Sequence, residues 1–173
     1  MSLEFYFLRS SEQKIVTDML YYAQQLDEQS KELDDLPHLK IYNDFYGLTR
    51  KDLGIYVMQE SVVCGAIWSR RLNKEHNSKG FVCEECPVLN IAIKPAFRKQ
   101  GIGTKLMEQF LKEQSALSSC VSIELPKTPQ GVAFLEKFGF EPSTQNPQVL
   151  LKHLAPPKEQ KVQNTIDYSK WLD

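Results

Sequence analysis

The stretch of residues 88–103, VLNIAIKPAFRKQGIG, constrains the fold of this chain more than any other part of its sequence. An apolar run ends at Pro95, and a basic cluster and two glycines separated by one residue follow. From Thr104 onward, apolar residues recur at the spacing of one helix face. This order predicts a strand, a turn, a glycine loop and then a helix over residues 104–116.

The loop in front of this helix has the features of an anion-binding site. The start of a helix leaves about four backbone N–H groups without intrahelical partners, and these groups lie at the positive end of the helix dipole. Gly101 and Gly103 would let a ligand approach the backbone closely, while Arg98 and Lys99 add positive charge. The sequence therefore predicts that this loop holds a phosphate group.

Two common phosphate-binding loops do not match this segment. The P-loop requires G-x-x-x-x-G-K-[ST], and the chain contains no such run. The dinucleotide-binding pattern G-x-G-x-x-G requires a third glycine at the position of Leu106. The pattern that remains is R-x-x-G-x-G after a strand, which by itself is short.

The segment resembles motif A of the GNAT superfamily of acyl-CoA-dependent N-acyltransferases, whose signature is [QR]-x-x-G-x-[GA]. A second run, Phe134–Phe140, is similar to the closing helix of that family and its Gly-Phe turn. The resemblance covers roughly residues 4–154. It implies an α/β (α+β) domain with a mixed, mostly antiparallel central sheet, two splayed strands, and helices on both faces.

The resemblance also implies acetyl-CoA as co-substrate. The pantetheine arm would pair with the backbone of the strand before the loop, as a peptide adds to a sheet edge, and the pyrophosphate would lie over the loop. A primary amine of a small molecule or peptide would then attack the thioester directly. The residues expected to bind acetyl-CoA are Ile91, Ala92, Ile93, Arg98, Lys99, Gln100, Gly101, Ile102, Gly103 and Thr104.

The catalytic residues of the family are not matched in this chain. Leu135 stands where many members have a tyrosine on the closing helix, and Pro87-Val88 stands where some members have a glutamate. Two other carboxylates are candidates for the general base: Glu124, in an Ile-Glu-Leu context, and Glu85, at the start of the cofactor strand. The alternative for Glu124 is an exposed carboxylate on a strand, and the alternative for Glu85 is a solvated position at the entry of a strand.

Tyrosines earlier in the chain are further candidates that the sequence does not place, namely Tyr42, Tyr46 and Tyr56. The departing CoA thiolate has a free pKa near 8.5 or slightly above, so a dedicated acid could be dispensable. A catalytically weak or inactive acyl-CoA-binding protein of the same fold is therefore the alternative to an enzyme.

Periodicity and turn residues predict the remaining elements. Thr128 is expected to cap a helix that ends near Lys137, and Gly139 is expected to stop that helix. A helix with an apolar stripe is expected to follow the first strand. The other predicted strands cover residues 5–8, 52–59, 62–70, 81–93, 120–125 and 148–154, with a polar loop at 73–80.

Length and charge bound the function. The 173 residues suit one domain, predicted at 1–154, with a tail at 155–173 that is docked or flexible. The net charge of −1 does not indicate binding to nucleic acid or to an anionic membrane. No apolar run reaches the roughly 18 residues of a transmembrane helix, and the start lacks the basic region of a signal peptide. A cytoplasmic protein is expected.

Metal binding is not expected. Cys83 and Cys86 have the spacing of a zinc knuckle, but a second pair of cysteines or histidines is missing. The acceptor side would be built from residues 25–48 and 73–80. The acidic residues of the first range could attract a cationic amine or face solvent. A homodimer is left open, as is an interaction module whose tail mediates assembly.

Overall fold

The computed structural model describes residues 2–23, 32–33, 36–47 and 51–155. Within these residues, seven strands form one sheet in the order β1-β2-β3-β4-β5-β7-β6. The strands are β1 (Leu3–Phe7), β2 (Leu53–Gln59), β3 (Val62–Arg70), β4 (Val88–Ile93), β5 (Cys120–Glu124), β6 (Glu141–Pro142) and β7 (Val149–His153).

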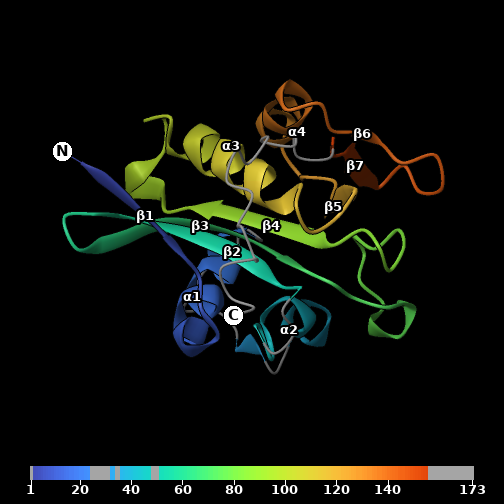
Figure 1. The fold of residues 1–173 in the computed structure, drawn as a ribbon, viewed down its shortest axis with the longest axis horizontal. Coiled ribbons are helices and arrows are strands. Elements are labelled where there is room, and N and C mark those ends of the chain that lie inside the picture. Colours follow the sequence, from blue (N-terminus) through green and yellow to red (C-terminus); the bar gives the residue numbers. More distant parts are fainter. Residues whose placement is uncertain (1, 24–31, 34–35, 48–50, 156–173) are drawn as a thin grey trace, which may run out of the picture.

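Helices cover both faces of this sheet (Figure 1). On one face lie α1 (Gln13–Ala23) and α2 (Pro37–Asn43), and on the other lie α3 (Ile102–Gln114) and α4 (Pro129–Lys137). Short 3-10 turns are η1 (Ser10–Glu12), η3 (Lys74–His76) and η4 (Pro95–Phe97). The predicted mixed sheet with helices on both faces is confirmed.

The pairing of β4 with β5 is the only parallel one in the described sheet. It consists of a single register pair, Val88 with Ser122, supported by a hydrogen bond of 2.9 Å from the Ser122 N–H to the Pro87 carbonyl. Beyond this pair the two strands diverge. The predicted splay of two central strands is therefore present, and its closed end lies at Val88.

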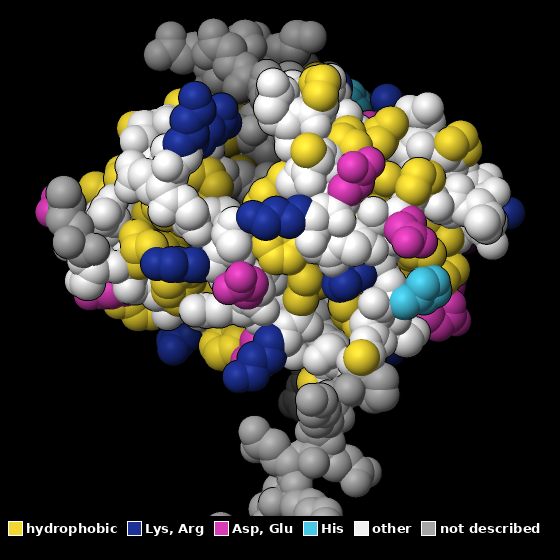
Figure 2. All heavy atoms as spheres, turned by 90° about the horizontal axis from the view of Figure 1, so that it is seen from above, with side chains coloured by type: hydrophobic (Ala, Val, Ile, Leu, Met, Phe, Trp, Pro, Cys, Tyr) yellow, Lys and Arg dark blue, Asp and Glu magenta, His cyan; other side chains and the backbone are white. Residues whose placement is uncertain are grey.

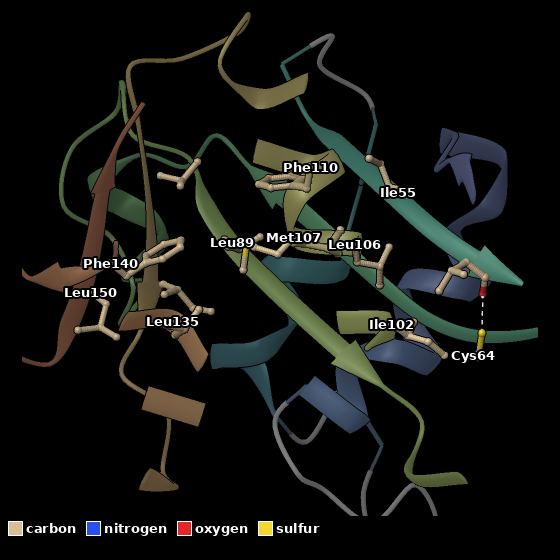
Figure 3. Packing of buried hydrophobic residues seen from close by; sticks show 14 residues of the cluster. Ile55, Cys64, Leu89, Ile102, Leu106, Met107, Phe110, Leu135, Phe140 and Leu150 are labelled. Atoms are coloured by element: carbon tan, nitrogen blue, oxygen red, sulfur yellow. Dashed lines mark hydrogen bonds between the residues drawn. The ribbon is translucent and has the colours of Figure 1, made fainter. Parts of the chain in front are cut away.

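The two faces of the sheet bury separate cores because side chains alternate along each strand. Leu89 of β4 packs in the cluster with α3, and Figure 3 shows it beside Met107. Val88 and Ala92 pack in the other cluster, with α1 and α2. Each fully buried large side chain, such as Phe110, contributes about 1.5–3 kcal/mol through removal of apolar surface from water.

Several predicted boundaries are confirmed. The predicted stripe on α1 buries Val16, Met19 and Leu20. Thr128 caps α4 by accepting a hydrogen bond of 3.1 Å from the Gly131 N–H. Gly139 follows that helix with φ of +86°, a conformation that favours glycine.

Several predictions are wrong at their edges, and the first strand spans Leu3–Phe7 instead of residues 5–8. The strand predicted over 81–93 begins only at Val88, because Pro87 has no N–H to donate and the Cys86 N–H bonds the Cys83 carbonyl in a turn. The helix predicted from Thr104 begins at Ile102, because Gly101, with φ of +78°, is already its N-cap. The short edge strand β6 was not expected at all.

Arg70 fixes α2 against the sheet. Its buried guanidinium donates to the carbonyls of Ile41, Asp44 and Phe45 and forms an ion pair of 3.2 Å with Asp52. These carbonyls lie at the C-terminal end of α2, where orphan acceptors need partners. The position of α2 thus depends on a charged group from β3.

Some predictions fall outside the described residues. They concern nearly all of the tail at 155–173 and the acidic residues Asp27, Glu28, Asp34 and Asp35. The boundary of the predicted domain therefore stays a prediction.

Candidate active site

A cleft opens where β4 and β5 diverge. It has a volume of about 210 Å³ and is lined by both strands, by the last turn of α1, by α2, and by the beginning of α4. A splayed strand pair leaves backbone N–H and C=O groups of β4 without a neighbour on one side, which is the arrangement that an extended ligand can complete.

The predicted pantetheine strand lines this cleft. Ile91, Ala92 and Ile93 all contribute to its wall, as does Arg98 after the strand. Arg98 is exposed, and its Nε donates to the Ile93 carbonyl at 3.0 Å. The guanidinium is thereby held at the open end of the cleft, with nitrogens left to face an anion.

The predicted phosphate loop stands at the same end. Lys99 and Gly101 both have positive φ, 63° and 78°. No side chain caps the N-terminus of α3, and a Cβ built on Gly101 would meet nothing within 4 Å. The space above this backbone is open, as an anion held by helix N–H groups requires.

The remaining loop residues differ in which of their groups can face a ligand. Gln100 is exposed and Thr104 is half-buried, whereas the Ile102 side chain is buried in the core, so only its backbone can face a ligand. Gly103 packs beside Phe134 of α4, and a Cβ there would lie 3.6 Å from the ring.

The two predicted carboxylates are not brought together. Glu124, at the end of β5, is half-buried and lines the cleft. Glu85 is exposed, lies in the turn before β4, and is not part of the cleft wall. The prediction for Glu85 gains no support from this placement.

Tyr42 of α2 also lines the cleft, whereas Tyr46 and Tyr56 do not. The Tyr42 hydroxyl lies 2.7 Å from Ser78 Oγ, and the Tyr42 carbonyl accepts a hydrogen bond of 3.0 Å from the Trp68 indole. Burial raises the pKa of Tyr42, and the nearby charge of Glu124 raises it further, while the Ser78 hydrogen bond lowers it. The phenol is therefore neutral at physiological pH.

The loop before β4 is tied to β5 beside Glu124. The Ser122 hydroxyl donates to the Gly80 carbonyl at 2.7 Å, and the Gly80 N–H donates to Ser78 Oγ at 3.2 Å. A Cβ on Gly80 would come within 3.1 Å of the Glu124 nitrogen and 2.8 Å of Val88. Residues 78–80 are thus packed against β5 and Val88 beside Glu124.

Leu135, at the position where many family members have a tyrosine, is buried in the cleft wall. The α4 helix therefore supplies no hydroxyl at this position. The sequence pattern did not single out Tyr22, which lines the cleft from the last turn of α1. The apolar stripe predicted for this helix ends at Ala23. The position of Tyr22 next to Ala23 was the one sequence signal that could have pointed to it.

The cysteines lie outside the cleft wall. The parallel pairing of Val88 with Ser122 puts Cys86 opposite Cys120. Burial raises the pKa of the Cys86 thiol strongly, and its hydrogen bond with Cys120 adds to this. Among the residues the structure describes, no group of three or more His, Cys, Asp or Glu could hold a metal ion.

The surface over α3 and α4 carries interspersed charges. Figure 2 shows lysines and arginines scattered singly among acidic and apolar side chains on this face. Across the described part of the chain, no helix is long and apolar enough to cross a membrane.

Comparison with known proteins identifies the class. Residues 51–142, which include β2 to α4, match the acetyltransferase (GNAT) domain family. The match spans the splayed strands, the glycine loop and the closing helix described above. The chain belongs to the GNAT acetyltransferase family, whose members are acyltransferases.

Solved structures agree on the fold. A GNAT acetyltransferase from Staphylococcus aureus Mu50 has a TM-score of 0.63 at 15% identity, covering 89% of this chain and 100% of that one. A GNAT acetyltransferase from Brucella melitensis, solved in complex with acetyl-CoA, has a TM-score of 0.59 at 16% identity, covering 90% of each chain.

A third structure is the ribosomal-protein-S18-alanine N-acetyltransferase from Escherichia coli. Its TM-score is 0.55 at 15% identity, covering 93% of this chain and 98% of that one. No curated protein sequence matches the chain significantly. At these identities the likeness shows the fold alone.

Proposed function

We propose that this chain transfers the acetyl group of acetyl-CoA to a primary amine of a small molecule or peptide. One observation carries the proposal. The cleft between β4 and β5 is lined both by Arg98, which precedes a loop suited to phosphate, and by a carboxylate, Glu124. A phosphate site and a candidate base on one cleft are what this transfer requires.

The loop and strand would hold acetyl-CoA. N–H groups of residues 98–104 and the Arg98 guanidinium would bind the pyrophosphate. The backbone of Ile91, Ala92 and Ile93 would bind the pantetheine amides as an added strand does. When bound, the thioester supplies the electrophilic acetyl carbon. The Brucella melitensis relative was solved with acetyl-CoA, which supports this choice of co-substrate.

Glu124 is proposed as the general base. An amine must lose a proton to attack, and a carboxylate in the cleft can accept that proton directly or through one water. The C–N bond forms as the C–S bond breaks, and the electron pair leaves with the CoA thiolate. A backbone N–H of β4 can stabilise negative charge on the acetyl oxygen. Much of the rate would come from holding both reactants in one cleft.

The test is release of free CoA thiol from acetyl-CoA in the presence of a panel of primary amines. Turnover with at least one amine is expected. Calorimetric binding of acetyl-CoA without turnover on any amine would instead favour a non-catalytic acyl-CoA-binding protein, the alternative motivated by Leu135.

Gly101→Val tests the phosphate loop separately. A β-branched side chain disfavours the φ of +78° at this position, so we expect the acetyl-CoA Kd to rise at least about tenfold. Gly101→Asn is the matched control, because asparagine tolerates left-handed backbone better and should retain more affinity. An unchanged Kd in folded Gly101→Val would remove the loop from the binding site.

A further inference from the structure

Strand β1 forms one edge of the described sheet, where β2 is its one neighbour. It contains neither lysine nor proline, the residues that commonly block the edge of a sheet. Phe7 is 58% exposed and Tyr6 is 43% exposed. None of the residues of β1 belongs to the described wall of the cleft. This edge is therefore a second surface of the molecule, with the backbone and the side chains to pair with a further strand.

The hydrogen bonds to β2 show which backbone groups of β1 face outward. The Leu8 N–H, directly after the strand, donates to the carbonyl of Gly54, the residue opposite it, at 2.8 Å. Hydrogen-bonded pairs alternate with non-bonded pairs along an antiparallel ladder. The even-numbered residues of β1 therefore bond β2, and the odd-numbered residues direct their N–H and C=O groups away from it. These outward residues are Leu3, Phe5 and Phe7.

The side chains of the same three residues share one face of the sheet. Leu3 and Phe5 pack against the core under α3, and alternation puts Phe7 on that face as well. A groove of about 300 Å³ lies between this strand and α3. From α3 it is lined by Gln109, Lys112 and Glu113. The edge thus combines outward backbone groups with an apolar surface on one side.

The sequence of β1, Leu-Glu-Phe-Tyr-Phe, is complementary to itself. Its alternation of apolar and polar residues is symmetric about Phe5. In an antiparallel pairing of two copies centred on this residue, Phe5 faces the partner's Phe5, and Leu3 faces the partner's Phe7. All of these residues have outward backbone groups, so each facing pair can exchange two hydrogen bonds.

Charge favours the same register. Glu4 is the one charged residue of β1, and it accepts a hydrogen bond of 2.6 Å from the Tyr6 hydroxyl. The pairing about Phe5 puts Glu4 opposite the partner's Tyr6, a neutral hydrogen-bond donor. A pairing centred on Glu4 would instead set two carboxylates opposite each other, which is destabilising, and would need backbone groups that already bond β2.

We propose that β1 is a dimer edge, through which two copies of this chain pair antiparallel about Phe5 and continue the sheet from one protomer into its partner. The exposed Phe7 ring packs on the partner's Leu3, which removes apolar surface from water. Because the strand is short, the interface is small and the association depends on protein concentration. The pairing does not depend on acetyl-CoA or on the cleft.

The test is amide hydrogen exchange of the full chain, measured by NMR at several protein concentrations. We expect the Phe5 and Phe7 amides to exchange at least about tenfold more slowly at high concentration, because only the dimer bonds them. The Tyr6 and Leu8 amides, which bond β2, should be protected at every concentration. Sedimentation over the same range should show a mass that rises from one chain of 20.0 kDa toward two chains.

Phe7→Lys is the disrupting variant, because a lysine on an edge strand opposes pairing and would lie against the partner's Leu3. We expect the Kd of the dimer to rise at least about tenfold. A Tyr6 amide that stays protected shows that β1 is still folded onto β2. Phe45→Lys is the matched control and should leave the Kd unchanged. Phe45 is 72% exposed and follows α2, on the other face of the sheet.

Three results would overturn the inference. The first is a chain that stays monomeric at every concentration. The second is a monomer whose Phe5 and Phe7 amides are as protected as those of Tyr6 and Leu8, which would mean that another segment of the chain covers this edge. The third is a dimer whose Kd is the same in Phe7→Lys as in the unchanged protein, which would place the interface on another surface.

Discussion

At the scale of single residues, Glu124 and Glu85 show how position decides chemistry. Both are glutamates near the start or end of a cleft strand, and the local sequence makes each a candidate for the general base. The fold puts Glu124 in the cleft wall and leaves Glu85 exposed in the turn before β4. The difference arises because Pro87 delays the start of β4, so Glu85 never enters the sheet.

These two carboxylates form a matched pair for mutagenesis. We expect Glu124→Gln to lower kcat/KM by about 10²-fold or more, the usual contribution of a positioned base, and Glu85→Gln to remain within about twofold because surface changes are small. Steady-state rates over a pH series measure both. An unchanged pH–rate profile in Glu124→Gln would remove it as base, and a large loss in Glu85→Gln would restore the second candidate.

At the scale of elements, α2 is a short helix whose place is set by one buried cation. Its seven residues are too few to be stable alone. Arg70 satisfies carbonyls at its C-terminal end and is itself neutralised by Asp52. Tyr42, on this helix, reaches the cleft as a consequence.

Arg70→Ala should lower the free energy of unfolding by about 3–5 kcal/mol, because it leaves Asp52 and several carbonyls buried without their partner. Arg71→Ala is the matched control. Arg71 makes a bond of 2.8 Å from its side chain to the Glu84 carbonyl at an exposed site, so about 1 kcal/mol is expected. Urea unfolding measures both, and equal losses would contradict the special role of Arg70.

At the scale of the whole molecule, the two cores hold neutral acids whose burial links stability to pH. Burial raises the pKa of Tyr42, Tyr46 and the Cys86 thiol. Each group binds its proton more tightly when folded than when unfolded. The stability associated with these protons is complete below the unfolded pKa values, 9.0 for cysteine and 10.0 for tyrosine, and is lost as pH rises above them.

We therefore expect the free energy of unfolding to be level near pH 7 to 8 and to fall above about pH 9, by up to about 1.4 kcal/mol per pH unit for each group. Urea unfolding at pH 7.5, 9.5 and 10.5 measures this. Tyr46→Phe should make the decline shallower, because it removes one of the buried acids. A stability that rises above pH 9 would contradict the assignment.

Much of the fold was predictable from local patterns. The boundaries of β2 and β3, the Thr128 cap and the Gly139 stop were accessible because each depends on neighbours within a few residues. The start of β4 was missed, since hydrophobic residues occur on both sides of Pro87 and do not say where pairing begins. Tyr22 was missed as a wall residue for a different reason: an apolar helix stripe does not reveal what the residues beside it face.

The sequence by itself determined the loop of residues 98–103 and the order of strand, loop and helix around it, because glycine conformation and helix N–H groups are local properties. It also named Glu124 as a candidate base. Only the tertiary structure decided that Glu124 and not Glu85 lines the cleft, and that Tyr42 joins it from α2. Those placements depend on the splay of β4 from β5 and on the buried Arg70, which are contacts between residues far apart in the chain.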